Sequence, residues 1–473
     1  MSSRESNALP RACLAASAVT LGHALQIANG FYDERALSWL TAALVLALGG
    51  IFIPSISLRW RQSAASRFRG RDHEHWLHLA TSAAIAWQIL SLFQASPGIS
   101  LTERADLNLF KAGVIAEAAL IGIGTVRIRM LVRAWFPVLL VVQFALGTWL
   151  LRAAPSPPID VVTVHRQALH ALGERRSPYQ ITFKNIYGAG SGNYNPSLVE
   201  GDRVMFGYPY PPLSLLLAAP GQFIAGDYRY AQLIGWIGAA GLIGYARASL
   251  FAKLAAALLL TTPRGFFVLE QGWTEPIALL MLALTVFSMT RKPSLSAWAV
   301  GLLIVTKQYL ALAVPLLWRF AKSRSNTRSV LARAALVGAL VTVPFVLWHP
   351  RSFIESVVLL QTREPFRIDS LSYLSWAARH GLGAGSYAWA IAAATVGLAA
   401  TMWATPNTAS GFATSLALAT FATFAFGSKA FCNYYFFVVG ALCCAASAAS
   451  SSQPEHPAVA LTQPEHPPES PPA

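Results

Sequence analysis

Residues 155–180 read PSPPIDVVTVHRQALHALGERRSPYQ, and after a Gly-, Asn- and Ser-rich run residues 201–220 read GDRVMFGYPYPPLSLLLAAP. This polar stretch from Pro155 to Pro212 interrupts a chain dominated by apolar segments of about 20 residues, the length that crosses a bilayer. Asp160 stands shortly after one such segment, at the start of a run that is able to form a helix. The stretch therefore predicts a polar loop held at the ends of membrane helices.

Composition places the chain among polytopic membrane proteins. Hydrophobic residues make up 55% of the 473 positions and charged residues only 12%, with a mean hydropathy of +0.47. Soluble domains carry about 25% charged residues. The net charge of +15 comes from Lys and Arg in short links between apolar segments, where such residues orient helices in the membrane. This distribution argues against nucleic acid as a partner.

The apolar segments predict an all-α, polytopic integral membrane protein with about 12–13 transmembrane segments. Dense basic links at 59–71 and 127–133 alternate with the first five segments. The positive-inside rule then places the N-terminus in the cytoplasm and the loop with Asp160 outside. A later apolar run, 295–317, has basic links at both ends and Lys307 near its middle. It predicts two half-length helices with Lys307 at their shared tip.

The chain divides into three predicted parts. Residues 1–133 form an N-terminal membrane extension of four helices, and residues 134–449 form the main membrane domain with an outer loop at 153–212. Residues 450–473 are rich in Pro and Ser and contain QPEHP twice. Such a composition cannot bury a core, so this tail is predicted to be disordered.

Asp160 is the candidate catalytic residue. A carboxylate at the membrane surface is able to accept the proton of an attacking hydroxyl group. On spacing alone, an exposed loop carboxylate or a helix N-cap explains Asp160 as well. His165 stands five residues after Asp160, which is not the i, i+4 spacing of a helical metal pair, so these residues predict no metal site. A requirement for a divalent metal stays open.

Other side chains are candidates for contacts with an anionic substrate. Lys307 lies in an apolar run, where a charge costs about 2.5–3.5 kcal/mol and usually faces a cavity or a partner. Snorkelling of this side chain to the interface is the alternative. Lys429 lies at the outer end of a membrane segment, and Arg363 lies in the polar loop 349–385. The YPYPP run at 208–212 predicts a rigid, aromatic-lined approach to the next segment, although an interfacial aromatic belt explains it equally.

Five segments of the chain resemble, in the same order, the C-type membrane glycosyltransferases that use polyprenyl-phosphate sugars. The resemblance is to glycosyltransferase family 87, whose members include actinobacterial alpha-mannosyltransferases. The segments lie within residues 134–449 and read IDVVTVHRQALHALGERRSPY, YPYPPLSLLLAAP, QGWTEP, VTKQYLALAVPLL and SKAFCNYYFF. The resemblance implies a C-type glycosyltransferase fold in the bacterial plasma membrane. It also implies transfer of a hexose such as mannose from a polyprenyl-phosphate donor to a lipid-linked or cell-envelope glycan acceptor at the outer face.

In such enzymes an acidic residue of the first outer loop is the catalytic base, which here corresponds to Asp160. The resemblance also implies that Lys307 and Lys429 lie near the donor phosphate. With the residues above, it gives these candidates for substrate binding: His165, Arg166, Tyr179, Tyr208, Tyr210, Lys307, Gln308, Arg363, Lys429 and Tyr434. The chain departs from the family pattern in its four additional N-terminal segments. It also lacks an Asn in QGWTEP, which weakens a role for Gln271.

Two other functions compete with this interpretation. A lipid or sugar transporter or flippase would show internal repeats and paired broken helices in both halves of the chain. The sequence shows one broken helix, at Lys307, and no matching one. A structural partner subunit would tolerate Asp160→Asn without any loss of function.

Overall fold

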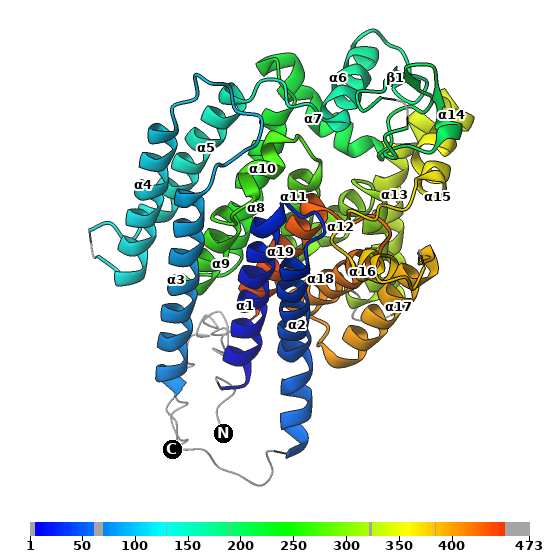
Figure 1. Ribbon diagram of the computed structural model, residues 1–473. Coiled ribbons are helices and arrows are strands. Elements are labelled where there is room, and N and C mark those ends of the chain that lie inside the picture. Colours follow the sequence, from blue (N-terminus) through cyan, green and yellow to red (C-terminus); the bar gives the residue numbers. More distant parts are fainter. Residues whose placement is uncertain are drawn as a thin grey trace, which may run out of the picture.

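The structure is a computed structural model that describes residues 5–60, 70–128, 130–188, 190–320, 324–383 and 385–449. The described chain consists mostly of helices, as the sequence predicts (Figure 1). The basic link at 61–69 and the tail at 450–473 lie outside the described residues.

The N-terminal extension forms long helices that pack on the rest of the protein. They are α1 (Glu5–Ala28), α2 (Glu34–Trp60), α3 (Gly70–Gln94) and α4 (Leu107–Val126), and α5 (Trp135–Ala153) follows them. α1 packs against α2 and also against α19 (Cys432–Ala448), the last helix of the chain. α3 packs against α9 (Leu250–Leu260). The extension thus packs on the main domain through at least α1 and α3.

The predicted outer loop has secondary structure of its own. It contains α6 (Asp160–Gly173), β1 (Phe183–Lys184), the 3₁₀ turn η2 (Pro196–Leu198), β2 (Val199–Glu200) and β3 (Arg203–Val204). The three strands form an antiparallel sheet in the order β1-β3-β2, with Val204 opposite both Phe183 and Val199. α7 (Pro212–Ala225) then begins at a proline, whose fixed φ and missing N–H suit the first turn of a helix.

The middle of the chain contains α8 (Arg229–Ala246), α9, α10 (Gly265–Glu270), α11 (Glu275–Arg291), η3 (Pro293–Leu295), α12 (Ser296–Ile304) and η4 (Gln308–Phe320). The apolar run 254–269 is not one continuous helix, because it is broken between α9 and α10. Pro263 lies in the break and lacks the N–H that a continuing helix would need. The predicted break at Lys307 is confirmed, although its second half is a 3₁₀ helix.

The C-terminal part completes the bundle and adds short helices, of which α14 and α15 lie near the outer loop (Figure 1). Its elements are α13 (Arg324–Trp348), α14 (Pro350–Ile354), the π-helical turn η5 (Glu355–Leu359), α15 (Leu360–Arg363), α16 (Tyr373–Arg379), α17 (Tyr387–Ala404), α18 (Ala409–Ala425) and α19. α18 packs between α17 and α19.

Within the described residues, five helices are long and apolar enough to cross a membrane. They are Glu34–Phe52, Glu74–Gln94, Leu107–Val126, Trp135–Ala153 and Thr327–Trp348. α13 is the most apolar of them and exposes Leu340 and Leu347 on its surface. Such an exposed apolar surface is typical of contact with lipid. Six shorter apolar helices accompany these five, and the larger number of about 12–13 spans stays a prediction.

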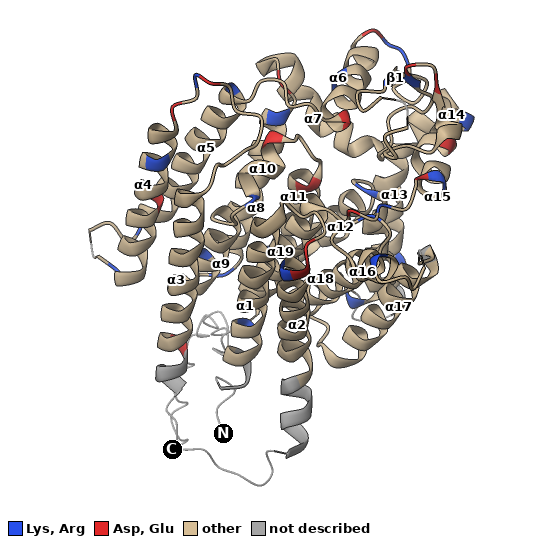
Figure 2. Ribbon diagram, in the orientation of Figure 1, with Lys and Arg blue, Asp and Glu red and all other residues tan. Residues whose placement is uncertain are grey.

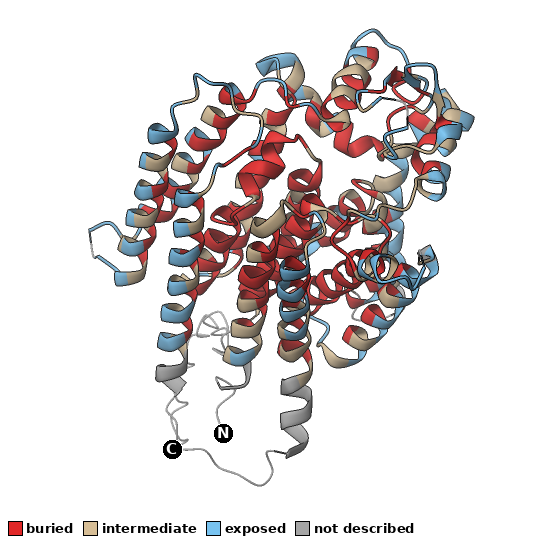
Figure 3. Cartoon of the chain, viewed as in Figure 1, coloured by how far each residue is buried: buried red, intermediate tan, exposed pale blue. Residues whose placement is uncertain are grey.

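Charge and burial divide the molecule into a polar end and an apolar body. Charged side chains gather around α6, α7 and α14, whereas the central helices carry few of them (Figure 2). The centre of the bundle is buried, whereas the outer faces of α3 and α4 are exposed (Figure 3). The α3–α4 loop and the loop after α5 lie toward the polar end, and the α4–α5 turn lies at the other end of those two helices (Figure 1). α4 and α5 therefore run in opposite directions, as predicted for consecutive membrane segments.

Candidate active site

Asp160 lines a cavity of about 660 Å³ at the polar end of the bundle. Five other predicted site residues line the same cavity, namely Tyr210, Lys307, Gln308, Lys429 and Tyr434. They come from segments far apart in the sequence, which the helical bundle brings together. The volume falls within the range of about 300–1,000 Å³ that is usual for small-molecule sites.

The Asp160 carboxylate is held by three donors. Asp160 is the first residue of α6, and its Oδ1 accepts the N–H of Val161 at 2.8 Å and the Tyr187 hydroxyl at 3.2 Å. Its Oδ2 accepts the Tyr194 hydroxyl at 2.7 Å. Burial, followed by the charge of Asp160, raises the pKa of both phenols, so they remain protonated donors. A carboxylate offers about four lone-pair positions, and these three donors occupy three of them.

Lys307 lines the cavity and is surrounded by three aromatic rings. Its Nζ lies 4.9 Å, 5.7 Å and 5.3 Å from the ring centroids of Tyr210, Tyr309 and Tyr434. The ammonium group forms a buried ion pair with Glu275, whose Oε1 also accepts the Asn433 amide at 2.8 Å. Glu275 is completely buried and Lys307 is 3% exposed, so the interface alternative of a snorkelling lysine is excluded.

Two further cations line the cavity on the side of the second polar loop. Lys429 donates to Glu364 at 2.6 Å, and Arg367 binds both carboxylate oxygens of Asp369 at 2.9 Å and 2.7 Å. Both cations and Glu364 face the cavity. Three cations and two carboxylates therefore meet around one space, with Asp160 as the carboxylate held by neutral donors.

Five side chains predicted to contact substrate lie away from this cavity. His165, which belongs to α6, and Tyr208 are fully buried, and Tyr179 donates its hydroxyl to the Tyr210 carbonyl at 3.1 Å. Tyr179 and Arg363 line a separate cavity of about 330 Å³. Arg166 binds the Pro155 carbonyl at 3.0 Å. These five side chains thus do not line the Asp160 cavity, and their role in substrate binding stays a prediction.

His165 fastens α6 to the YPYPP segment. Its Nδ1 lies 2.9 Å from the Val161 carbonyl and its Nε2 lies 2.9 Å from the Tyr208 hydroxyl, and its ring stacks on Tyr228. Since a carbonyl only accepts, Nδ1 carries the proton and Nε2 accepts the Tyr208 hydrogen. Burial, partly offset by the Val161 hydrogen bond, lowers the pKa of His165 to about 4. The imidazole is thus neutral in the folded protein.

The lowered pKa of His165 predicts loss of stability in acid. Between pH 6.5 and 4 the unfolded chain binds a proton that the folded chain does not, so the free energy of unfolding falls as the pH falls. The contribution amounts to about 2 kcal/mol between pH 7 and pH 5. Thermal unfolding of the purified protein at both pH values measures it. His165→Asn should flatten the dependence, and the exposed His170→Asn on the same helix should not; an unchanged slope in His165→Asn would refute the assignment.

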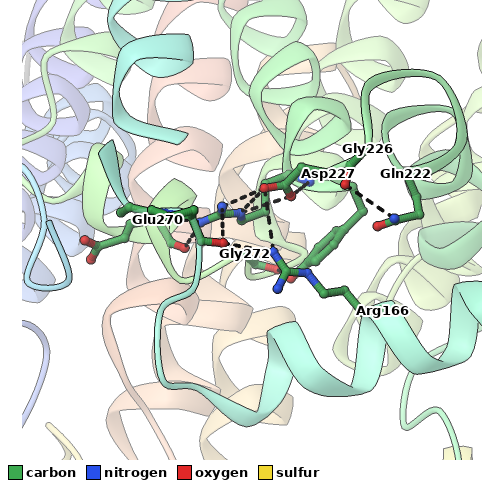
Figure 4. A network of polar contacts seen from close by, with 10 residues as sticks. Arg166, Gln222, Gly226, Asp227, Glu270 and Gly272 are labelled. Atoms are coloured by element: carbon green, nitrogen blue, oxygen red, sulfur yellow. Dashed lines mark hydrogen bonds and ion pairs between the residues drawn. The ribbon is translucent and has the colours of Figure 1, made fainter. Parts of the chain in front are cut away.

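A network of polar contacts that includes Arg166 of α6, Asp227 and Glu270 lies beside α6 (Figure 4). Arg229 is completely buried and donates to the carbonyls of Ala154 at 2.8 Å and Glu270 at 3.0 Å. It also pairs with Asp227 at 2.6 Å, and Arg166 of α6 lies 3.9 Å from the same carboxylate. The network joins the end of α5, the start of α8 and α6, and so holds the helix that begins with Asp160.

Four residues of the site were not predicted as site residues from the sequence. Tyr187 and Tyr194 hold Asp160, and Glu275 and Glu364 pair with the two lysines. The tyrosines lie in the Gly-, Asn- and Ser-rich run, where large aromatic residues were themselves a signal. Glu275 carried a signal too, because a carboxylate heading an apolar segment needs a partner.

Within the described residues, no three His, Cys, Asp or Glu side chains come together in a way that could hold a metal ion. Searches of family models, of curated proteins and of solved structures find no match to this chain.

Proposed function

We propose that this protein is a membrane glycosyltransferase that moves a hexose from a polyprenyl-phosphate donor to a lipid-linked or cell-envelope glycan. The observation that carries the proposal is one cavity that is lined both by an oriented carboxylate, Asp160, and by three cations, Lys307, Arg367 and Lys429. The carboxylate suits a hydroxyl nucleophile, and the cations suit a departing phosphate. The acceptor and donor groups of such a transfer thus find complementary partners in the same space.

The reaction is a direct displacement at the anomeric carbon. The acceptor oxygen forms a bond to that carbon while its proton passes to Oδ2 of Asp160. The bond between the anomeric carbon and the phosphate oxygen breaks, and its electron pair leaves with the polyprenyl phosphate. Tyr187 and Tyr194 keep the carboxylate in place, so it need not reorganise during the step. Asp160 acts as the general base.

The cations stabilise the phosphate in different ways. Arg367 presents a planar guanidinium group that suits two phosphate oxygens, whereas Lys307 and Lys429 act as point charges. Each is already paired with a carboxylate, namely Asp369, Glu275 and Glu364. A phosphate therefore binds as an additional partner of cations whose positions are fixed in advance. Stabilisation by such preorganised charge is usually the largest single contribution to enzymatic rate enhancement.

Mass spectrometry of a complete reaction tests the proposal. Purified full-length protein is incubated with polyprenyl-phosphate mannose and envelope glycolipid, and the products are weighed. The proposal predicts a glycolipid heavier by one hexose together with sugar-free polyprenyl phosphate. A transporter would leave the sugar–phosphate bond intact. Intact donor in the presence of both substrates, with folded protein, would refute glycosyl transfer for this pair.

A further inference from the structure

The N-terminal extension supplies part of the cavity wall. Asn29 and Phe31 from the α1–α2 turn and Ile99 from the α3–α4 loop line the same cavity as Asp160. We infer that the α1–α2 turn is a saccharide subsite, in which Asn29 and Phe31 bind a sugar ring of the substrate. This inference rests on the proposed function and gives the extension a role in selecting the glycan.

The turn is fixed against the part of the main domain that carries two of the cations. Gly30 has a φ of 77°, and a Cβ at this position would collide with the backbone of Cys432, so only glycine permits the close approach. Phe31 forms a β-bridge with Ser370, and the Tyr32 N–H donates to the Asp369 carbonyl at 2.8 Å. The turn therefore has one position relative to the segment of Arg367.

The Phe31 ring offers a flat apolar surface to the cavity. Phe31 is 45% exposed, and its ring centroid lies 5.5 Å from that of Phe431, which in turn lies 4.8 Å from the Arg367 guanidinium. Trp273 lines the same cavity. A partly exposed aromatic ring beside a cation is suited to the C–H face of a sugar next to a phosphate. A purely apolar ligand would form no favourable electrostatic contact with the Arg367 guanidinium.

Asn29 adds a polar group that lacks a partner. Its Oδ1 is buried, and no hydrogen-bond donor reaches it among the described residues. Two other cavity-lining residues, Tyr309 and Ser428, also carry a buried hydroxyl group without a hydrogen-bond partner among the described residues. A buried polar atom without a partner costs about 1–3 kcal/mol. Sugar hydroxyl groups, which both donate and accept, match such a set better than a hydrocarbon chain does.

Hydrogen bonds to Glu270 also hold the α3–α4 loop of the extension against the main domain. The buried Glu270 carboxylate accepts the backbone N–H groups of Ile99 at 3.0 Å and Ser100 at 2.8 Å, and the Gln271 amide at 3.0 Å. A Cβ on Gly98 would collide with this carboxylate. Both loops of the extension thus meet the cavity through specific contacts, which a mere membrane anchor would not require.

Binding measurements test the subsite without turnover. Full-length protein carrying Asp160→Asn serves as the parent, and Asn29→Gly or Phe31→Ala is added to it. Glycine suits the φ of 54° at Asn29, and Phe31→Ala leaves the backbone bridge in place. The probes are polyprenyl-phosphate mannose, polyprenyl phosphate without sugar, and mannotriose. Arg127→Gly, at a φ of 59° outside the cavity, and the exposed Trp76→Ala are the matched controls.

We expect each subsite variant to weaken binding of a sugar-bearing probe about tenfold, and neither control to do so. Weaker binding of polyprenyl-phosphate mannose, with sugar-free lipid unchanged, assigns the subsite to the donor hexose. Weaker binding of mannotriose assigns it to the acceptor. Parent-like affinities in Phe31→Ala, whose unfolding temperature reports its fold, would overturn the subsite and leave the proposed transfer intact. A folded parent that binds none of the probes would contradict both proposals.

Discussion

Asp160→Asn should lower the rate of hexose transfer about 10²–10⁴-fold, the usual effect of removing a general base. The amide keeps the shape of the side chain but accepts no proton, so donor affinity and folding should remain near those of the wild type. Transfer under saturating donor, together with donor binding, measures the two effects separately. Asp202→Asn is the matched control, because Asp202 is an exposed carboxylate of the same loop that does not line the cavity. Turnover above about a third of the wild-type rate would be incompatible with a general base at this position.

Lys307→Met should destabilise the fold by about 3–5 kcal/mol, because it leaves the Glu275 carboxylate buried without its cation. Adding Glu275→Gln should recover most of that loss, since the double variant buries no charge from this pair. Chemical unfolding in detergent measures both variants. Transfer should stay low in the double variant even though its fold recovers, because the cation near the donor phosphate is absent.

The exposed ion pair Arg351–Glu355 is the matched control for this experiment. Its side chains are 91% and 41% exposed, so Arg351→Met should change the free energy of unfolding by less than about 1 kcal/mol. Recovery of both stability and transfer in the Lys307/Glu275 double variant would show that the pair is structural and that Lys307 does not bind donor.

Local sequence patterns were sufficient for the position of Asp160 and for the break at Lys307. A polar residue at the head of a helical run predicted the start of α6, and a lysine within an apolar run between basic links predicted two half-length pieces. Both features depend on residues near one another in the chain. Periodicity and the membrane cost of a charge act at that range.

Contacts between distant segments could not be read in the same way. Tyr194 reaches Asp160 because the Gly-rich loop folds back over α6, and Asn433 reaches Glu275 from the last helix. His165 and Tyr208 carry polar groups that suit a ligand equally well, but they satisfy each other at 2.9 Å. A single sequence does not show which polar groups meet, because that depends on the packing of the helices.

The role of the extension was also outside the reach of sequence patterns. Residues 1–133 look like additional membrane helices, and the NGFY segment at their first turn resembles an ordinary loop. Its contribution to the cavity depends on Gly30 fitting against Cys432 and on Glu270 holding the α3–α4 loop. Neither partner lies in the extension itself.

The most direct measurement of glycosyl transfer by one displacement is the anomeric configuration of the product. Wild-type protein is incubated with polyprenyl-phosphate mannose labelled with ¹³C at the anomeric carbon and with envelope glycolipid, and the anomeric signals are followed by NMR. Attack by an acceptor that Asp160 deprotonates predicts loss of the donor signal and growth of a product signal of inverted configuration. A product of retained configuration would contradict the single displacement, and an unchanged donor signal would contradict transfer itself.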